Sequence, residues 1–208
     1  MKRARKLHSQ TRIPRSFYRR DAVSVARNLL GQRLVTCVGG RRTSGIVVET
    51  EAYLGHLDKA AHTYGNRRTA RNETMWGDAG HLYVYFVYGI HHCANVVAGS
   101  TGEPVAVLVR ALQPDCGTDV MFERRRRARR DTDLCSGPGK LCQALGIARD
   151  FDGADLVEGN LIAMERLRQR CLPSARIASG PRVGVGYAEE WQGKHLRYWV
   201  RGNPHVSK

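Results

Sequence analysis

The segment from residue 33 to residue 53 places the strongest constraint on the fold of this chain. Arg33–Val38 and Thr43–Tyr53 are rich in β-branched residues, and the pair Gly39-Gly40 stands between them. Two adjacent glycines accept the positive φ angles that a tight hairpin turn requires. The segment therefore predicts two antiparallel strands joined by a short turn, and the fold must accommodate that pair.

A helix is predicted just before this hairpin. Asp21 is a favourable N-cap, an apolar stripe runs from Ala22 to Leu30, and Gly31 can end the helix in the left-handed conformation. Similar patterns predict strands near residues 81–88, 93–97, 105–112, 161–164, 182–185 and 196–200, and helices near residues 118–129 and 138–145.

Three prolines and a glycine set the expected ends of two of these elements. Pro104 and Pro114 bound the strand at 105–112, while Pro138 suits the first position of the last helix and Gly146 its end.

No linker or internal repeat divides the chain, and 208 residues suit one core. The expected fold class is therefore α+β, a single compact domain with a mainly antiparallel sheet. Residues 1–15 are rich in arginine and lysine and are expected to form a flexible basic arm, which assigns the domain to residues 16–208.

The charge of the chain indicates a polyanionic partner. Lysine and arginine number 34 against 19 aspartate and glutamate residues, a formal net charge of +15. A cationic surface gains free energy by displacing the counterions condensed on phosphates, so nucleic acid is favoured over an anionic membrane. No apolar run approaches the roughly 20 residues that span a bilayer, and no secretory signal is evident.

The six cysteines do not indicate a metal site. None of them forms a Cys-x2-Cys pair, and a chain of this length does not depend on disulfides. We expect buried free thiols in a reducing cytoplasm, and no metal or cofactor.

The most suggestive acidic pattern is Glu49-Thr50-Glu51-Ala52-Tyr53. On a strand, Glu49, Glu51 and Tyr53 would share one face, because side chains alternate with a period of two. One interpretation is an exposed strand end, since carboxylates mostly lie at the surface. The other is a carboxylate that activates water or binds a metal, although His62 and the pair His91-His92 match no zinc-binding pattern.

Two further segments suit a nucleic-acid partner. Tyr83, Tyr85 and Tyr88 lie within six residues and lead into Gly89, which offers aromatic surface on which a base could stack. The second is Arg124–Arg130, which holds six arginines in seven residues and is either a solvated face or a phosphate contact.

A phosphate site is also expected where the last helix begins. Ser136-Gly137-Pro138-Gly139-Lys140 precedes that helix, so its backbone N–H groups and Lys140 could hold a phosphate, although the Walker spacing is absent.

Five blocks together resemble one known family. They are GIVVETEAYLG, HLYVYFVYGI with Asn95 soon after, LVRALQP, CSGPGKLCQALGI, and RVGVGYAEEW followed by LRYWVRGNPHVS. In this order they resemble the alkyladenine DNA glycosylase family, the 3-methyladenine glycosylases of mammalian type. The resemblance covers Phe17 to Ser207 and implies a monofunctional enzyme that cleaves the N-glycosidic bond of alkylated or deaminated purines.

The resemblance also implies a role for each matching residue. Glu51 would be the general base that activates water, which Arg110 and the main-chain carbonyl of Val183 help to hold. The remaining roles concern the base and the DNA: Tyr53, His62, Tyr85 and Asn95 would form the pocket for the flipped base, and Tyr88 on a protruding β-hairpin would fill the gap left in the duplex. Contact of Arg124, Arg125 and Lys140 with the DNA backbone is expected from the basic charge of their segments.

The expected partner is double-stranded DNA bound through the minor groove by a monomer, with no membrane, in the bacterial cytoplasm or in a nucleus. Ile90 and His91 depart from the large apolar or aromatic residues typical of the family at the hairpin tip. We therefore expect the hairpin tip to contact DNA differently from that of the family, and the affinity for DNA to depend on pH if His91 approaches a phosphate.

The alternatives for the function are a non-catalytic binding module and a metal-dependent nuclease that uses Glu49, Glu51 and His62. The ranking of 3-methyladenine, 7-methylguanine, hypoxanthine and ethenoadenine stays open.

Overall fold

An antiparallel sheet organises the chain in the computed structural model, which describes residues 11–207. Its strands are β1 (Arg33–Val38), β2 (Arg41–Tyr53), β3 (Leu82–Val87), β4 (His91–Ala98), β5 (Val105–Cys116), β6 (Ile162–Glu165), β7 (Ile177–Gly180) and β8 (Arg197–Val200). The α-helices are α1 (Arg15–Tyr18), α2 (Ala22–Leu29), α3 (Thr118–Arg124), α4 (Asp131–Cys135) and α5 (Pro138–Leu145). Short 3-10 turns occur at Gly55–Leu57, Tyr64–Asn66, Glu73–Trp76, Arg149–Phe151, Ser174–Arg176 and Glu189–Trp191.

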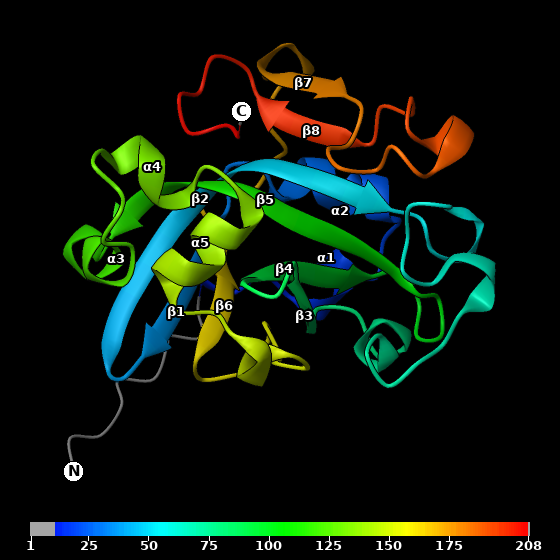
Figure 1. Cartoon of the computed structure of the whole chain (residues 1–208), viewed down its shortest axis with the longest axis horizontal. Coiled ribbons are helices and arrows are strands. Elements are labelled where there is room, and N and C mark those ends of the chain that lie inside the picture. Colours follow the sequence, from blue (N-terminus) through cyan, green and yellow to red (C-terminus); the bar gives the residue numbers. More distant parts are fainter. Residues whose placement is uncertain (1–10, 208) are drawn as a thin grey trace.

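Strand β2 is the hub of the sheet. The strand order is β3-β4-β5-β2-β1-β6, and β8 also pairs with β2 and carries β7 on its other side. Strand β2 therefore pairs with three strands: β1, β5 and β8. Figure 1 shows β2 and β5 side by side through the middle of the molecule, with α5 in front of them and α2 behind. The expected α+β class with an antiparallel sheet is confirmed.

Helix α2 forms for the reasons that its sequence indicates. The Asp21 side chain accepts a hydrogen bond from the backbone N–H of Ser24, which satisfies one donor of the first turn. Val25, Ala26 and Leu29 are fully buried against the sheet, and Gly31 follows with φ at +82°. The predicted helix and its two end signals are confirmed.

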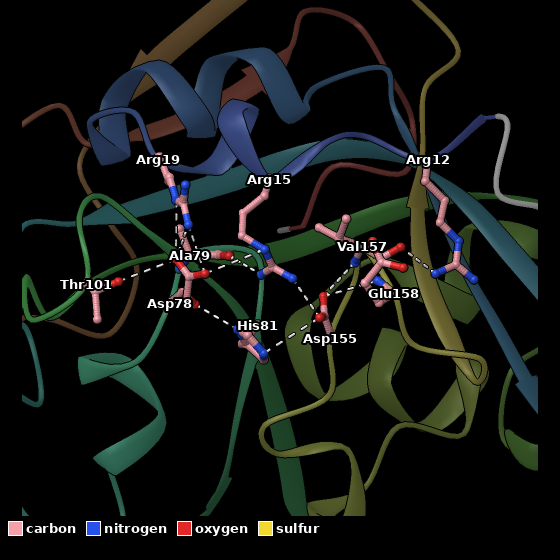
Figure 2. Close-up of polar contacts among 10 residues, drawn as sticks. All are labelled: Arg12, Arg15, Arg19, Asp78, Ala79, His81, Thr101, Asp155, Val157 and Glu158. Carbon is pink, nitrogen blue, oxygen red and sulfur yellow. Dashed lines mark hydrogen bonds and ion pairs between the residues drawn. The ribbon is translucent and has the colours of Figure 1, made fainter.

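The described start of the chain is fastened to the domain by arginines (Figure 2). Arg15 contacts Asp155 at 2.6 Å and the carbonyl oxygen of Ala79 at 2.6 Å, and Arg19 pairs with Asp78 at 3.1 Å. Residues 1–10 of the expected flexible arm lie outside the described residues. The rest of that arm is packed, since Ile13 is fully buried.

Strand β5 is longer than its sequence predicts. It continues through Pro114 to Cys116, whereas Pro114 was expected to end it. A proline inside a sheet is tolerated at a bulge, and the β2–β5 register shifts between Ser44 and Gly45, where Gly45 lies opposite Pro114.

The predicted helix at 118–129 is also wrong in length. Helix α3 ends at Arg124, and α4 begins after a break. The carboxylate of Asp133 accepts the backbone N–H groups of Arg129 and Arg130, which satisfies donors at the start of the new helix and so favours a restart.

The strand expected at 182–185 does not form. The strand in this region is β7, at Ile177–Gly180. Arg182 instead lies outside the sheet, where its buried guanidinium pairs with the carboxylate of Asp58.

The cysteines fit the expectation in part. All six are free thiols, and four of them are buried, but Cys116 and Cys171 are exposed. Within residues 11–207, no helix combines the length and the apolar character that crossing a bilayer requires.

Gly117 joins β5 to α3, and its replacement by alanine tests how closely the backbone packs at this junction. Its φ is +74°, and a Cβ added there would lie 2.4 Å from the carbonyl oxygen of Arg42. We expect Gly117→Ala to lower the free energy of unfolding by about 3 kcal/mol, because a clash with backbone adds to left-handed strain. Gly102 has φ at +88° and nothing within 4 Å of an added Cβ, so Gly102→Ala isolates the strain. It should cost about 1 kcal/mol in urea denaturation. Equal losses would contradict the tight contact.

Candidate active site

The register of the sheet aligns side chains from five neighbouring strands in one row. The row runs through Tyr83 on β3, Asn95 on β4, Leu108 on β5, Glu51 on β2 and Arg197 on β8, each directly opposite the next. Residues directly opposite in antiparallel strands point to the same face. The Thr50 hydroxyl bonds to α2, so the neighbouring Glu51 and its row face away from α2.

A pocket of about 590 Å³ opens over this row. A volume of this size suits a small planar ligand. The lining includes eight of the residues singled out from the sequence: Tyr53, His62, Tyr85, Tyr88, Asn95, Lys140, Arg110 and Val183. The register therefore gathers at one place residues that are up to 130 positions apart in the chain.

Glu51 lies directly beneath the pocket lining and has no exposed surface. The Tyr53 hydroxyl donates to Oε2 at 3.0 Å, and the Val183 N–H donates to Oε1 at 2.8 Å. Arg110 Nη1 lies 3.4 Å from Oε1. Burial raises the pKa of Glu51, and the Arg110 guanidinium opposes that rise. Glu51 is consequently a stronger base than an exposed glutamate, and its three partners separate it from the pocket.

Glu49 is also fully buried, so the interpretation of an exposed strand end is wrong. Its carboxylate contacts Arg197 Nε at 2.5 Å and Arg110 Nε at 3.3 Å. Ser207 adds a backbone N–H at 2.7 Å and its hydroxyl at 3.0 Å. A buried carboxylate requires partners of this kind, because desolvation without compensation is costly.

Glu49, Glu51 and His62 do not form a metal-binding set. Among residues 11–207, no three histidine, cysteine or acidic side chains come close enough together to hold a metal ion. The His62 ring instead bonds through Nδ1 to the Tyr83 hydroxyl at 2.8 Å.

Aromatic rings form one wall of the pocket. The ring of His62 lies 4.6 Å from that of Tyr85, centroid to centroid, and Tyr83 lies 5.5 Å from Tyr85. Burial lowers the pKa of His62 to about 4 and raises the pKa of Tyr83 to about 12. Both groups are therefore neutral at pH 7, and the wall carries electron-rich, uncharged faces.

Asn95 is held in one orientation at the base of this wall. Its amide nitrogen donates to the carbonyl oxygen of Tyr83 at 3.2 Å, and the residue is almost fully buried. A side chain fixed in this way presents a defined group to anything that enters the pocket.

The segment Val183–Tyr187 contributes another part of the pocket lining, and the sequence did not reveal that the preceding Arg182 anchors it. The Arg182 guanidinium and the Asp58 carboxylate are both fully buried and approach to 2.5 Å. The same guanidinium lies 4.7 Å from the centroid of the Tyr53 ring. The two partners are 124 residues apart, so no local pattern reveals the pair. The only signal was the position of Arg182 immediately before Val183.

Tyr88 stands at the rim, in the turn between β3 and β4. Its side chain is 84% exposed, Ile90 is 71% exposed, and Tyr88 has a φ of +55°. His91 packs against the start of α5, since a Cβ added to Gly139 would lie 2.9 Å from its ring. Lys140, one residue further on, bonds to the Ser136 hydroxyl at 3.4 Å.

Arg124 and Arg125 lie away from the pocket lining and have internal partners. Arg124 donates to the Ala144 carbonyl at 3.0 Å, and Arg125 donates to the Gln143 side chain at 2.8 Å. The later arginines of the run are exposed: Arg126, Arg127, Arg129 and Arg130. Contact of Arg124 and Arg125 with DNA stays a prediction.

The buried state of Glu51 should leave a signature in stability. An unfolded glutamate has a pKa of about 4.3, and the folded value is raised. Between the two values the folded state binds more protons than the unfolded state, so the Glu51 contribution to stability falls as pH rises through this window. We therefore expect Glu51→Gln to become more stable relative to wild type as pH increases from 4 to 7. Chemical denaturation of both proteins across this range measures the difference, and a constant difference would contradict the raised pKa.

Comparison with known proteins identifies the family. A family model described as methylpurine-DNA glycosylase matches residues 16–204. A Bacillus cereus protein is 45% identical over 201 residues, which are 94% of this chain and 98% of that protein. A Bacillus anthracis protein is 44% identical over the same shares of both chains. Both carry the name "Putative 3-methyladenine DNA glycosylase". The chain therefore belongs to the methylpurine-DNA glycosylase family.

Proposed function

We propose that the protein flips alkylated or deaminated purines out of duplex DNA and hydrolyses the N-glycosidic bond with a water that Glu51 activates. Family membership makes it a DNA glycosylase that acts in DNA repair. The finer assignment rests on one observation: a fully buried carboxylate lies under an aromatic pocket, with an arginine beside it.

The chemistry requires a base close to C1′ of the damaged nucleotide. Cleavage passes through an oxocarbenium-like centre, and an adjacent carboxylate both deprotonates the attacking water and stabilises positive charge. Arg110 and the Val183 carbonyl would orient that water. Because Tyr53 and Val183 cover Glu51, the water reaches the carboxylate only after one of these groups shifts. Such rearrangement on substrate binding is common in enzymes.

The pocket suits a purine that carries positive charge. The rings of Tyr53 and Tyr85 attract cations, since guanidinium groups of Arg182 and Arg71 already lie over one face of each. His62 is uncharged at neutral pH, so it does not repel a cationic base. A 3-methyl or 7-methyl purine is already cationic and departs without a proton donor. Neutral lesions such as hypoxanthine and ethenoadenine gain less from these faces.

Asn95 would supply discrimination against normal purines. Its fixed amide would crowd the exocyclic amine of guanine. Rejection of this kind is needed because undamaged purines far outnumber damaged ones.

The rim of the pocket supports entry through the minor groove by a monomer. Extrusion of a base costs a few kcal/mol. Tyr88 is exposed on its turn and would fill the space that the base leaves. Lys140 and the start of α5 also line the pocket, and with the backbone N–H groups there Lys140 would hold a DNA phosphate.

Single-turnover excision from a duplex with one hypoxanthine, in the presence of EDTA, tests the proposal. We expect Glu51→Gln to bind the duplex but to lose about 10²–10⁴-fold in excision rate, the usual contribution of a general base. Glu165→Gln is a matched control, because Glu165 is another buried carboxylate held by arginines and lies outside the pocket.

Each contrary outcome has a distinct meaning. Full activity of Glu51→Gln would remove Glu51 from its role. Loss of wild-type activity in EDTA would favour the metal-dependent nuclease. A wild type that binds DNA yet releases no base from hypoxanthine or methylated duplexes would indicate a non-catalytic binding module.

The arginine run provides a separate test of DNA contact. We expect Arg126, Arg127 and Arg129, when changed together to serine, to weaken binding to all sequences. The slope of log K against log salt is negative, and each lost phosphate contact should make it shallower by about 0.9. Arg33→Ser is the control, because Arg33 pairs with Asp115 and Glu165 inside the protein and should change stability rather than slope. Fluorescence anisotropy at several salt concentrations measures both slopes, and an unchanged slope in the triple variant would exclude the contact.

A further inference from the structure

The proposed water-activating residues leave one buried acid without a role. Glu49 is fully buried in the middle of β2, does not line the pocket, and engages both of its oxygens. Ser207, close to the C-terminus, reaches this carboxylate through both its N–H and its hydroxyl. A cluster that is so completely satisfied fixes the groups that it touches.

The group that it touches is Arg110. The Arg110 Nε donates to the Ser207 hydroxyl at 3.1 Å and lies 3.3 Å from the Glu49 carboxylate. From its other side the same guanidinium faces Glu51, with Nη1 3.4 Å from Oε1. Arg110 is therefore a bridge between two carboxylates, and its Nε is turned toward Glu49 and Ser207.

The division of partners between the two carboxylates is unequal. Arg197 contacts Glu49 at 2.5 Å and also donates to the Ser207 carbonyl at 3.3 Å. Glu49 thus forms one ion pair with Arg197, which does not pair with Glu51, and a second with Arg110, which contacts both carboxylates. Glu51 has only the longer contact with Arg110, a backbone N–H and a tyrosine hydroxyl. A carboxylate with less compensation is the more basic one.

We infer that Glu49 and Ser207 are positioning residues that hold Arg110 at a fixed distance from Glu51 and thereby preserve the basicity of Glu51, an inference that rests on the proposed hydrolysis. Two effects act in the same direction. The negative charge of Glu49 repels the negative charge of ionised Glu51. The hydrogen bond that Arg110 Nε donates to Ser207, together with its ion pair with Glu49, also prevents the guanidinium from moving fully onto Glu51.

Other groups around Glu51 would remain in place when Glu49 is changed. The titratable and charged groups around it come from every neighbouring element: Tyr53 and Glu49 on β2, Tyr85 on β3, Cys93 on β4, Arg110 on β5, Arg197 directly opposite on β8, and Arg182 beyond β7. Of these, Glu49 is the one that contacts Arg110 without contacting Glu51 or lining the pocket.

The pH dependence of single-turnover excision, measured on the hypoxanthine duplex, tests the inference. In Glu49→Gln the pKa of Glu51 should fall, because a like charge is removed and Arg110 is free to approach. We expect the acid limb of the pH–rate profile to move to lower pH by about one unit. The plateau rate should fall roughly threefold to tenfold, because a weaker base abstracts the proton less readily. Glu49→Asp keeps the charge and should restore the limb to nearly its wild-type position.

Ser207→Ala separates orientation from charge. It removes the hydroxyl that accepts from Arg110 and donates to Glu49, and it leaves every charge in place. We expect about a tenfold lower plateau rate, the usual worth of one hydrogen bond to a charged group, and an acid limb that moves to lower pH by less than in Glu49→Gln, because Arg110 is freed while the charge of Glu49 stays. A wild-type rate in this variant would contradict the positioning role of Ser207.

The control is Glu165→Gln, in which a buried carboxylate bonded to Arg33 and Arg42 is neutralised far from the pocket. A purely structural role of Glu49 predicts that Glu49→Gln and Glu165→Gln lower the rate equally at every pH. That result, or a limb that coincides with wild type, would overturn the inference. If Glu49→Gln does not fold, the excision rates of Glu49→Asp and Ser207→Ala test the inference instead. Wild-type rates in both variants would overturn the inference. Failure of the proposed function appears differently, as absence of excision by wild type or as full activity of Glu51→Gln.

Discussion

The burial of two carboxylates on one strand is the constraint on which the rest of this structure depends. Glu49 and Glu51 lie side by side on β2 without exposed surface, and isolated buried charges of this kind would destabilise the fold. Compensation comes from elsewhere in the chain: Arg110 on β5, Arg197 on β8 and the segment that ends at Ser207. The three strands and the C-terminal segment must therefore dock in one arrangement, and that arrangement also builds the site.

The register of the sheet connects this charge compensation to the pocket. Strand β2 pairs with β5 on one side and β8 on the other, so Glu51 has Leu108 and Arg197 as direct neighbours. The row continues through Asn95 to Tyr83, and both residues line the pocket. A slip of one residue in any pairing would turn the affected side chains to the opposite face. The positions of Glu51 and Asn95, to which we assign base chemistry and discrimination, therefore rely on the same backbone hydrogen bonds as the sheet pairing.

Features that depend on neighbouring residues, such as helix ends, could be predicted from the sequence. Buried ion pairs between distant residues could not. Asp21, Gly31, Pro138 and Gly146 act through contacts within a few residues, so the helix ends that they indicate are correct. Period-two alternation likewise put Glu49 and Glu51 on one face of the first hairpin. Alternation does not reveal which strand lies opposite, and so it left open whether the two carboxylates lie at an exposed strand end or in a site. The buried pair Asp58–Arg182 and the bulge that accommodates Pro114 depend on partners more than 60 residues away. The roles assigned to Glu51, Asn95 and Tyr88 came from family resemblance, and only their placement around one pocket follows from the structure.

The surroundings of Glu49 also bear on which bases can leave. Hydrolysis of sugars commonly employs a second carboxyl group that protonates the leaving group. Glu49 is the nearest second carboxylate, but both of its oxygens accept bonds from Arg197 and Ser207, and it does not line the pocket. It is therefore unavailable as a proton donor to a base that lies among Tyr53, His62 and Tyr85. With His62 neutral and the tyrosines protonated at pH 7, the pocket holds no strong acid among these groups. Under the proposed function, such a site would act best on purines that already carry a positive charge, as methylated bases do.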